Sequence, residues 1–251
     1  MAGITRSSDP WARLRQWTPA RIGLGRSGAS LPTRPLLEFE LAHARARDAV
    51  HAAFDADALA RSLRDAGFGE PAIVRSQARD RMEYLLRPDL GRSLDDGSRA
   101  RLQPASSCAL AIVIADGLSA VAPARHAVLL LEELRRQSPP LENVTMVVAN
   151  LARVALGDEI GELLHADAVV VLIGERPGLS SPDSLGVYLT WAPRVGRSDA
   201  ERNCISNVRP EGLPYAEAAA RLAWLLSQAR RLQISGVGLK DDSESGRRIL
   251  P

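Results

Sequence analysis

Three stretches of the chain are almost continuously apolar, and each one ends in polar or glycine residues. They are residues 108–115 (CALAIVIA), 144–149 (VTMVVA) and 168–173 (AVVVLI). A strand covered by helices on both faces has this composition, whereas a strand with one face in water alternates. Helical patterns separate these runs, which predicts parallel strands joined by crossover helices. The predicted fold class is therefore α/β, a Rossmann-like parallel sheet flanked by helices.

Weaker patterns add further elements to this core. Residues 187–191 predict a fourth strand, and residues 72–76 and 83–86 predict two short strands earlier in the chain. Residues 95–97 read Asp-Asp-Gly and are expected to form a polar loop. The longer helices are expected at residues 36–54, 57–66, 124–137, 158–165 and 214–233.

These elements divide the chain into four predicted segments. They are an N-terminal extension (1–35), a smaller and mainly helical N-terminal domain (36–105), a Rossmann-like ligand-binding domain (106–240) and a flexible tail (241–251). In the extension, Asp9 and Pro10 begin a short predicted helix with Trp11, Leu14 and Trp17 on one side. So short a helix does not persist alone in water, and exposed tryptophans mark contact surfaces. We therefore expect the extension to dock on a partner chain; the alternatives are that its helix packs on the chain's own N-terminal domain or that the segment is a targeting address.

The composition excludes several classes of protein. Lys+Arg of 32 against Asp+Glu of 30 leave a formal charge of +2, so no global field attracts nucleic acid. The sequence has no apolar run near the roughly 18 residues of a membrane span, and no apolar signal core. Two cysteines, Cys108 and Cys204, form no disulfide framework and lack metal-site spacing. We expect a soluble protein of the reducing cytoplasm, without a membrane or nucleic-acid partner.

Polar or glycine-rich residues follow three of the predicted strands. They are residues 116–119 (DGLS), 150–154 (NLARV) and 174–178 (GERPG). Ligands bind beyond the carboxyl ends of the strands in an open parallel sheet, so this convergence predicts a ligand site without naming the ligand. In the last segment two glycines would let a ligand approach the backbone, beside Glu175 and Arg176. The alternative is an ordinary turn with a local Glu175–Arg176 ion pair.

Single residues leave other functions open. Cys204 is a candidate nucleophile, ligand contact or core residue, and residue type alone favours the core. Asp116 could bind a ribose hydroxyl or cap the following turn. A G-x-G-x-x-G match at residues 23–28 follows no buried strand, so it is weak, and the sequence has no Walker A, zinc or serine-hydrolase motif. No catalytic or metal-ligating residue is assigned, because the four histidines lie on predicted helices or their ends: His43, His51, His126 and His165.

Seven stretches, in order and over almost the whole chain, match one protein family. They are TPARIGLGRSG (18–28), AHARARDAVH (42–51), YLLRPDLGR (84–92), VIADGLSA (113–120), LIGERPGLSSPDSLGVY (172–188), ERNCISNVRPEGLPYAEAA (201–219) and ISGVGLK (234–240). In these stretches the chain resembles the small (light) subunit of ethanolamine ammonia-lyase, and GERPG and NCISN are the most specific motifs. The resemblance implies a lyase that converts ethanolamine to acetaldehyde and ammonia by a radical mechanism.

The resemblance implies adenosylcobalamin as the cofactor, bound between this chain and a large subunit. By the family's motifs, contacts to cobalamin carry over to Val154, to Glu175 in GERPG and to Cys204 in NCISN. Glu175 would accept hydrogen bonds from corrin amide groups. Corrinoid proteins that supply a histidine to cobalt carry D-x-H-x-x-G, which this sequence lacks. The resemblance therefore implies base-on binding, without a cobalt ligand from this chain.

The resemblance also implies how the chain assembles and where it works. It would be the non-catalytic subunit of a hetero-oligomer, with six copies each of this chain and of a large subunit that holds the substrate in a TIM barrel. The enzyme would be cytoplasmic, either free or within a bacterial microcompartment. From the residues alone, a self-sufficient Rossmann-type enzyme or nucleotide-binding module competes with this hypothesis. That alternative predicts a dinucleotide fingerprint and a catalytic base near the strand ends, and the sequence shows neither.

Overall fold

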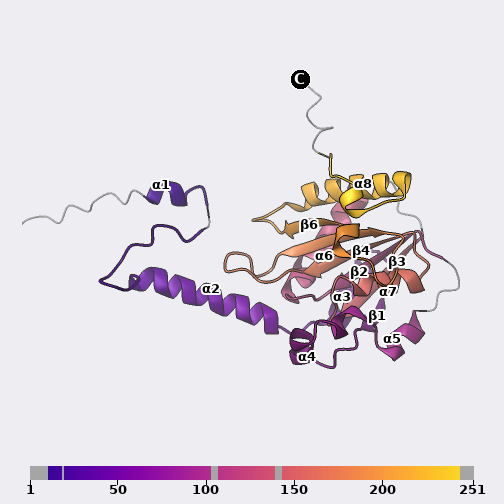
Figure 1. Ribbon diagram of the computed structural model, residues 1–251, viewed down its shortest axis with the longest axis horizontal. Helices are drawn as coiled ribbons and strands as arrows, with labels where there is room; N and C mark the ends of the chain where they lie inside the picture. The colour runs from indigo at the N-terminus through magenta and orange to yellow at the C-terminus, as the bar shows by residue number, and fades with distance from the viewer. Residues whose placement is uncertain (1–10, 19, 103–106, 139–142, 244–251) are drawn as a thin grey trace, which may run out of the picture.

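The computed structural model of the chain describes residues 11–18, 20–102, 107–138 and 143–243, and Figure 1 shows their arrangement. One six-stranded sheet with helices on both faces forms the body, and a long helix leaves it near the N-terminus. The strands are β1 (Ala72–Arg75), β2 (Leu110–Ala115), β3 (Val144–Asn150), β4 (Ala168–Gly174), β5 (Leu185–Trp191) and β6 (Arg202–Val208). The α-helices are α1 (Ala12–Arg15), α2 (Thr33–His51), α3 (Ala56–Asp65), α4 (Arg81–Leu86), α5 (Asp96–Arg101), α6 (Val121–Gln137), α7 (Leu156–Leu163) and α8 (Tyr215–Leu232).

The sheet is mixed, and its strands lie in the order β1-β3-β2-β4-β5-β6. The first four strands in this order are parallel, but β5 runs antiparallel to β4, and β6 antiparallel to β5. The predicted α/β class is confirmed, whereas the prediction of an all-parallel sheet is wrong. Residues 175–184, which join β4 to β5, contain no helix. A parallel crossover needs a dozen or more residues and usually a helix, so the chain returns as a hairpin.

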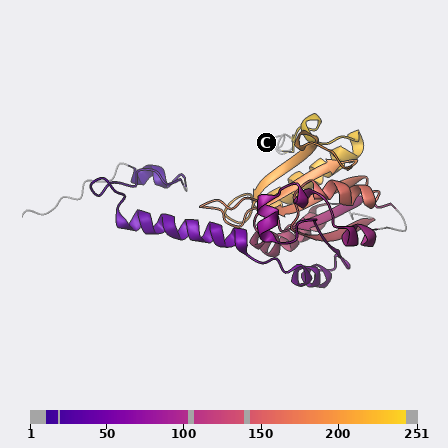
Figure 2. The same ribbon diagram turned by 60° about the horizontal axis from the view of Figure 1, so that its bottom comes forward.

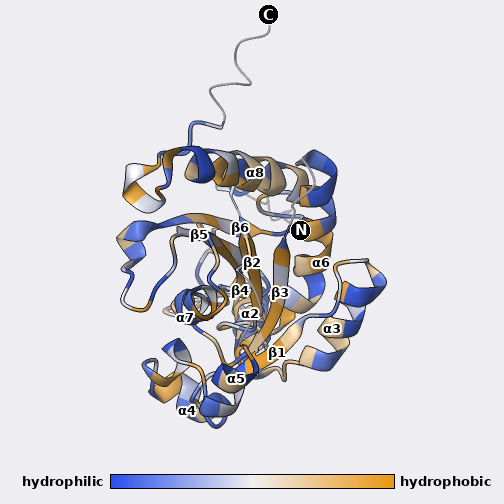
Figure 3. Cartoon of the chain, turned by 90° about the vertical axis from the view of Figure 1, so that its right-hand side faces the viewer, coloured by the Kyte–Doolittle hydropathy of each residue, from blue (hydrophilic) through white to orange (hydrophobic). Residues whose placement is uncertain are grey.

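Each face of the sheet packs against its own helices, as Figure 3 shows. One apolar cluster joins alternate residues of β2, β3 and β4 to α3, α6 and α8. The other cluster joins the intervening strand residues to α7 and to apolar residues around α5. This alternation is the period of two expected of strands, and it makes both faces of the central strands apolar. We refer to the second face as the α7 face.

Two local predictions are wrong and one strand was not predicted, and each difference has a local cause. Residues 83–86 belong to α4 instead of a strand, because the Asp80 carboxylate caps a helix by accepting a hydrogen bond from Glu83 N at 2.8 Å. The predicted loop at 95–97 likewise begins α5, with Asp95 as N-cap, accepting from Ser98 N at 2.6 Å. Strand β6 was not predicted, since polar residues cover one of its faces and leave no apolar run.

The N-terminal part of the described chain is anchored to the body in two places. Strand β1 pairs in parallel with β3 at the edge of the sheet. Helix α3 packs into the same apolar cluster as α6 and α8. The predicted short N-terminal helix corresponds to α1, while Asp9 and Pro10 lie outside the described residues. Most of the predicted tail, from residue 244, also lies outside them. None of the helices in the described ranges is long and apolar enough to cross a membrane.

Candidate functional site

The three polar strand ends singled out by the sequence lie together at one edge of the sheet. Strands β2, β3 and β4 are parallel neighbours, so their carboxyl ends share that edge. Leu118 N, after β2, donates to the carbonyl of Gly174 at the end of β4, at 2.9 Å. Ala152 N, after β3, donates to Oδ1 of Asp116 at 3.0 Å. The predicted convergence is therefore confirmed as direct contact between the three segments.

Glu175 directly follows β4 and is half-buried. Its backbone N donates to Ser184 O at 3.0 Å, which closes the base of the hairpin. Its carboxylate Oε2 accepts from Asn207 N at 3.1 Å, while Oε1 accepts no hydrogen bond from the residues that the structure describes. The alternative of a Glu175–Arg176 ion pair finds no support in those residues either. One carboxylate oxygen is therefore fixed by the protein, and the other is left as an acceptor.

Gly174, the first glycine of GERPG, is required by the protein's own packing. A Cβ at Gly174 would lie 2.0 Å from the carbonyl oxygen of Ser119, so glycine is needed there for contact within the protein. A Cβ at Gly186 of β5, which is opposite Ile173 of β4, would lie 3.1 Å from both the Glu175 Cγ and the Tyr188 ring. The absence of a side chain at Gly186 thus leaves room for the glutamate.

Cys204 is exposed, so the core interpretation favoured by residue type is wrong. It lies in β6 directly opposite Tyr188 of β5, so the two side chains are neighbours on the same face of the sheet. Loss of water contact raises the pKa of the Cys204 thiol, the neighbouring Tyr188 side chain lowers it, and the nearby Glu175 charge raises it further. The net pKa is raised, which keeps the thiol protonated at neutral pH. Cys204 is therefore placed as a neutral surface contact and not as an activated nucleophile.

Val154 lies between the end of β3 and the start of α7. It is partly buried against the apolar cluster of the α7 face, and Tyr188 packs against the same cluster. A Cβ at Gly157 in the first turn of α7 would lie 2.3 Å from Val171 of β4, so the helix begins close over the sheet. Since Cys204 is opposite Tyr188, the structure brings all three sequence-predicted residues to the α7 face near the carboxyl edge. Strands β5 and β6 extend this face beyond α7.

Two residues that the sequence reasoning missed, Arg81 and Tyr84, support this edge through Asp116 and Ala152. Asp116 is 2% exposed, and Arg81 Nη1 lies 3.2 Å from its Oδ2. Burial raises the pKa of Asp116 to about 6, against the opposing effects of Ala152 N and Arg81. The buried Tyr84 donates from its hydroxyl to Ala152 O at 3.0 Å. Asp116 therefore holds the neighbouring loop, and its burial argues against contact with a ribose.

The Tyr84 ring also contacts two cations. The guanidinium carbon of Arg81 lies 4.9 Å from the ring centroid, and that of Arg153 lies 4.2 Å from it. All three residues could have been suspected from the sequence, since Tyr84 begins the YLLRPDLGR stretch and Arg153 precedes Val154. Their role in the edge was visible only once β1 and α4 were placed beside the ends of β2 and β3.

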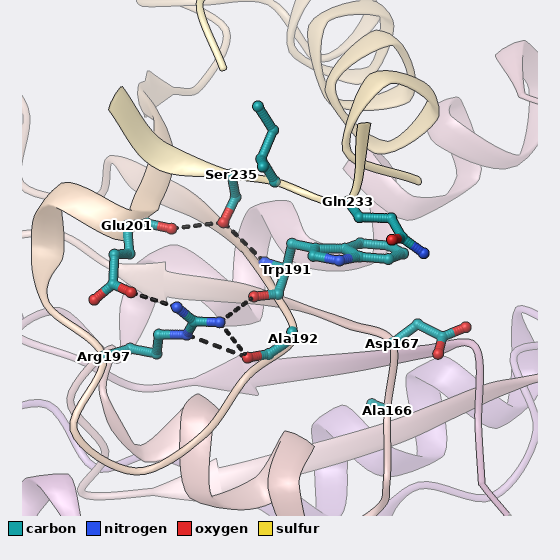
Figure 4. Close-up of a pocket in the computed structure, with 9 residues that line it drawn as sticks. Ala166, Asp167, Trp191, Ala192, Arg197, Glu201, Gln233 and Ser235 are labelled. Carbon is teal, nitrogen blue, oxygen red and sulfur yellow. Dashed lines mark hydrogen bonds and ion pairs between the residues drawn. The ribbon is translucent and has the colours of Figure 1, made fainter. Parts of the chain in front are cut away.

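A cavity of about 530 Å³ lies at the opposite edge of the sheet, where β5 ends at Trp191 (Figure 4). The polar side chains of Arg197, Glu201 and Ser235 in its lining are bonded within the protein. Arg197 pairs with Glu201 and donates to Ala192 O at 2.9 Å, and Ser235 Oγ accepts from Trp191 N at 2.9 Å and donates to Glu201 O at 2.6 Å. These bonds tie the β5–β6 connection to the end of α8. The cavity therefore has a structural explanation and is not the candidate site.

The described residues contain no group of three or more His, Cys, Asp or Glu side chains placed to hold a metal ion. Of the histidines, His126 is buried and its Nδ1 lies 2.7 Å from the Tyr215 hydroxyl. Burial lowers the pKa of His126, although Asp183 opposes this. Its environment is that of a packed core histidine on α6. Among the described residues, the Cys204 thiol near Glu175 is kept protonated by its raised pKa and is not an activated nucleophile.

Fold and site together define an α/β protein with a mixed sheet and a candidate ligand face at its carboxyl edge. A family model described as "Ethanolamine ammonia-lyase light chain" matches residues 8–240. The ethanolamine ammonia-lyase small subunit of Pseudomonas aeruginosa (strain LESB58) is 56% identical over 245 residues, covering 95% of this chain and 89% of the relative. The small subunit of Xanthomonas campestris pv. campestris (strain B100) is 55% identical over 249 residues, covering 96% and 90%.

The ethanolamine ammonia-lyase small subunit of Pseudomonas putida (strain W619) is 52% identical over 248 residues, covering 96% of this chain and 91% of the relative. The chain belongs to the ethanolamine ammonia-lyase light-chain family. The resemblance seen in the sequence is thereby confirmed. As a small subunit of a lyase, it has a large-subunit partner.

Proposed function

We propose that this chain binds adenosylcobalamin at the α7 face and presents it to the catalytic large subunit. The observation that carries the proposal is the half-buried Glu175 carboxylate. Its Oε2 is held by Asn207 N, and its Oε1 has no partner among the described residues. The fixed acceptor of Glu175 lies near the exposed, neutral thiol of Cys204. This arrangement can bind a large uncharged ligand that carries N–H donors at its periphery, such as the amide side chains of a corrin.

The residues present fit such a group in three ways. Glu175 would accept from a corrin amide, Cys204 would contact the ring periphery, and Val154 would supply an apolar surface. The fit is chemical, because a carboxylate favours amide donors, whereas a neutral thiol and a valine tolerate a large uncharged ligand. The missing D-x-H-x-x-G motif favours base-on binding, with no cobalt ligand from this chain. A dinucleotide is disfavoured, because Asp116 is buried.

When bound, adenosylcobalamin supplies the radical chemistry by which ethanolamine becomes acetaldehyde and ammonia. This chain would orient the cofactor and keep water from one side of it, while the large subunit holds the substrate. Although Glu175 lies near Cys204, the raised pKa of the thiol keeps it protonated, so neither side chain supplies an activated nucleophile. The small subunit is therefore non-catalytic in this proposal. We also propose that the enzyme contains six copies of each subunit. It would be located in the cytoplasm, either free or within a microcompartment.

Replacing Glu175 by Gln tests the cofactor site in the assembled two-subunit complex. The Gln variant loses the charge that strengthens hydrogen bonds to amide donors, which costs about 1–3 kcal/mol, or roughly ten- to hundredfold in affinity. The measurement is a corrinoid titration followed by absorbance. Glu162→Gln is a matched control, because the exposed Glu162 also accepts from a backbone N, that of Val195 at 2.9 Å, but lies at the opposite edge.

We expect the control complex to bind corrinoid like the wild type. An affinity of the Glu175→Gln complex within twofold of the wild type would show that Glu175 is only a turn residue. The non-catalytic role is tested separately by supplying adenosylcobalamin and ethanolamine to the isolated small chain. Sustained release of ammonia by that chain alone would contradict it.

A further inference from the structure

An N-terminal arm extends from the body of the protein. We define the arm as residues 11–51, which comprise α1, a glycine-rich connection and α2. Figures 1 and 2 show α2 pointing away from the sheet in two different views. Of the nineteen residues of α2, only Ala49, near its end, is buried. A helix of this length has no apolar support from the body along most of its course, although tertiary packing is what usually stabilises helices.

One side of α2 carries an apolar stripe. Leu37 is 58% exposed and Leu41 is 52% exposed, and the exposed Ala44 continues the line. Spacings of four and then three residues place these side chains on one side of a helix, in the pattern by which helices insert into grooves. At the outer end of the arm, Trp17 of the segment after α1 is 86% exposed, whereas Trp11 packs on the backbone of Gly23. Contiguous exposed apolar surface of this kind marks an interface.

The root of the arm is fixed to the candidate site. Arg81 Nε donates to the carbonyl of Val50 at the end of α2, at 2.7 Å. The same guanidinium donates from Nη1 to Gly117 O at 2.7 Å and pairs with Asp116. Gly117 in turn lies against Gly174, the residue before Glu175. Figure 1 shows α2 leaving the body at the end to which the β4–β5 loop also projects.

The charge of the arm differs from that of the rest of the chain. Its seven arginines against three carboxylates give a net charge of +4, while the whole chain has +2. Two copies of the arm would therefore repel each other, and a partner surface with an acidic border would attract the arm. The family match begins at residue 8, so the arm belongs to the part shared with chains named as small subunits. The family therefore requires a large-subunit partner, and the arm offers an exposed surface for it beside the candidate site.

We propose that the arm docks on the large subunit, with Leu37, Leu41 and Ala44 inserted into an apolar groove that has an acidic border. This inference rests on the proposed function, since it places the docking surface next to the cofactor face. Arg81 then connects the docked helix to the loop beside Glu175. The large subunit would be held at the same edge at which this chain binds cobalamin, so that assembly and enclosure of the cofactor occur together.

The test uses full-length small chains co-expressed with the large subunit. The arm variant is Leu37→Asp/Leu41→Asp, and the control is Val195→Asp/Val237→Asp, whose valines are also exposed, at 67% and 81%, but lie away from the arm. The complex is captured through a tag on the small chain, diluted in series, and the retained large subunit is measured. We expect the arm variant to dissociate at concentrations at least a hundredfold higher than the wild type, and the control to match the wild type. Leu37→Met/Leu41→Met is expected to restore assembly.

Three results would overturn the docking proposal. The first is an arm variant that assembles like the control. The second is a fall in the melting temperature of the isolated Asp variant, which would show that the stripe packs on its own chain. The third is a wild-type small chain that dimerises through the stripe in the absence of the large subunit. Failure of the wild-type chains to assemble at all would instead contradict the proposed function, so the two failures are distinguishable.

Discussion

A buried ion pair between Asp158 and Arg202 holds the two elements that carry Val154 and Cys204. Asp158 lies in α7 and Arg202 begins β6, and both side chains are 2% exposed. The guanidinium donates to both carboxylate oxygens, at 2.5 and 2.7 Å. Burial disfavours the charged guanidinium, but the hydrogen bonds and charge of Asp158 outweigh it and raise the pKa of Arg202. The pair is therefore ionised in the folded chain.

We predict that Asp158→Asn strongly destabilises the chain. Removing one member of a buried ion pair leaves the other charge uncompensated, which costs about 3–5 kcal/mol. Arg202 keeps acceptors in Arg197 O at 2.9 Å and Thr190 Oγ1 at 3.1 Å, so the lower end, about 3 kcal/mol, applies. With a urea dependence of about 3 kcal/mol per M for a domain of this size, the unfolding midpoint falls by ~1 M.

Equilibrium urea unfolding of the small chain, followed by circular dichroism, measures this shift. The variant Asp158→Leu/Arg202→Met replaces both charges by apolar groups and is expected to recover most of the loss. Glu38→Gln, which breaks an exposed pair with Arg34 on α2, is the control and is expected to leave the midpoint unchanged. A midpoint shift for Asp158→Asn as small as that of the control, or a double variant no more stable than the single one, would refute the reasoning.

Three further predictions concern the body of the protein. Because the folded pKa of Asp116 is about 6 and its usual value is 3.8, the free energy of unfolding should fall by about 2 kcal/mol as the pH rises from 4 to 6, and Asp116→Asn should remove this slope in urea titrations at several pH values. His126 has a lowered pKa, so stability should fall as the pH drops through its usual 6.5, and less so in His126→Gln. Tyr84→Phe leaves Ala152 O without its donor and should cost about 1–3 kcal/mol in the same assay.

The central sheet could be predicted from the sequence because its strands are buried on both faces. Strands β2, β3 and β4 show this as apolar runs, and their polar ends predicted the edge at which the three segments meet. Strand β6 could not be found in this way. Its buried residues are Arg202, Ile205 and Val208, and the first of these is hydrophilic. Arg202 is buried only because Asp158 neutralises it, and that partner lies 44 residues away in the chain.

The candidate site shows the same division between local and long-range information. Family motifs pointed to Val154, Glu175 and Cys204, and the structure brings them to one face. Sequence reasoning alone favoured burial of Cys204, because it could not show that β6 is an edge strand. It also missed Arg81, whose contacts with Val50 and Gly117 join segments that are distant in sequence. Propensity and periodicity report on neighbours along a chain, and such contacts leave no periodic pattern.

The reversal of direction after β4 explains why the α7 face stays open beyond α7. In an all-parallel sheet, each added strand brings a crossover helix that covers one face. Here β5 and β6 are added as hairpins, so they extend the sheet with no α-helix between β4 and β6. The α7 face therefore continues past α7 onto strands where Cys204 and Ser206 are exposed. The Asp158–Arg202 pair fixes this extension to α7, so the face is open yet rigidly positioned, as a surface shared with a partner subunit requires.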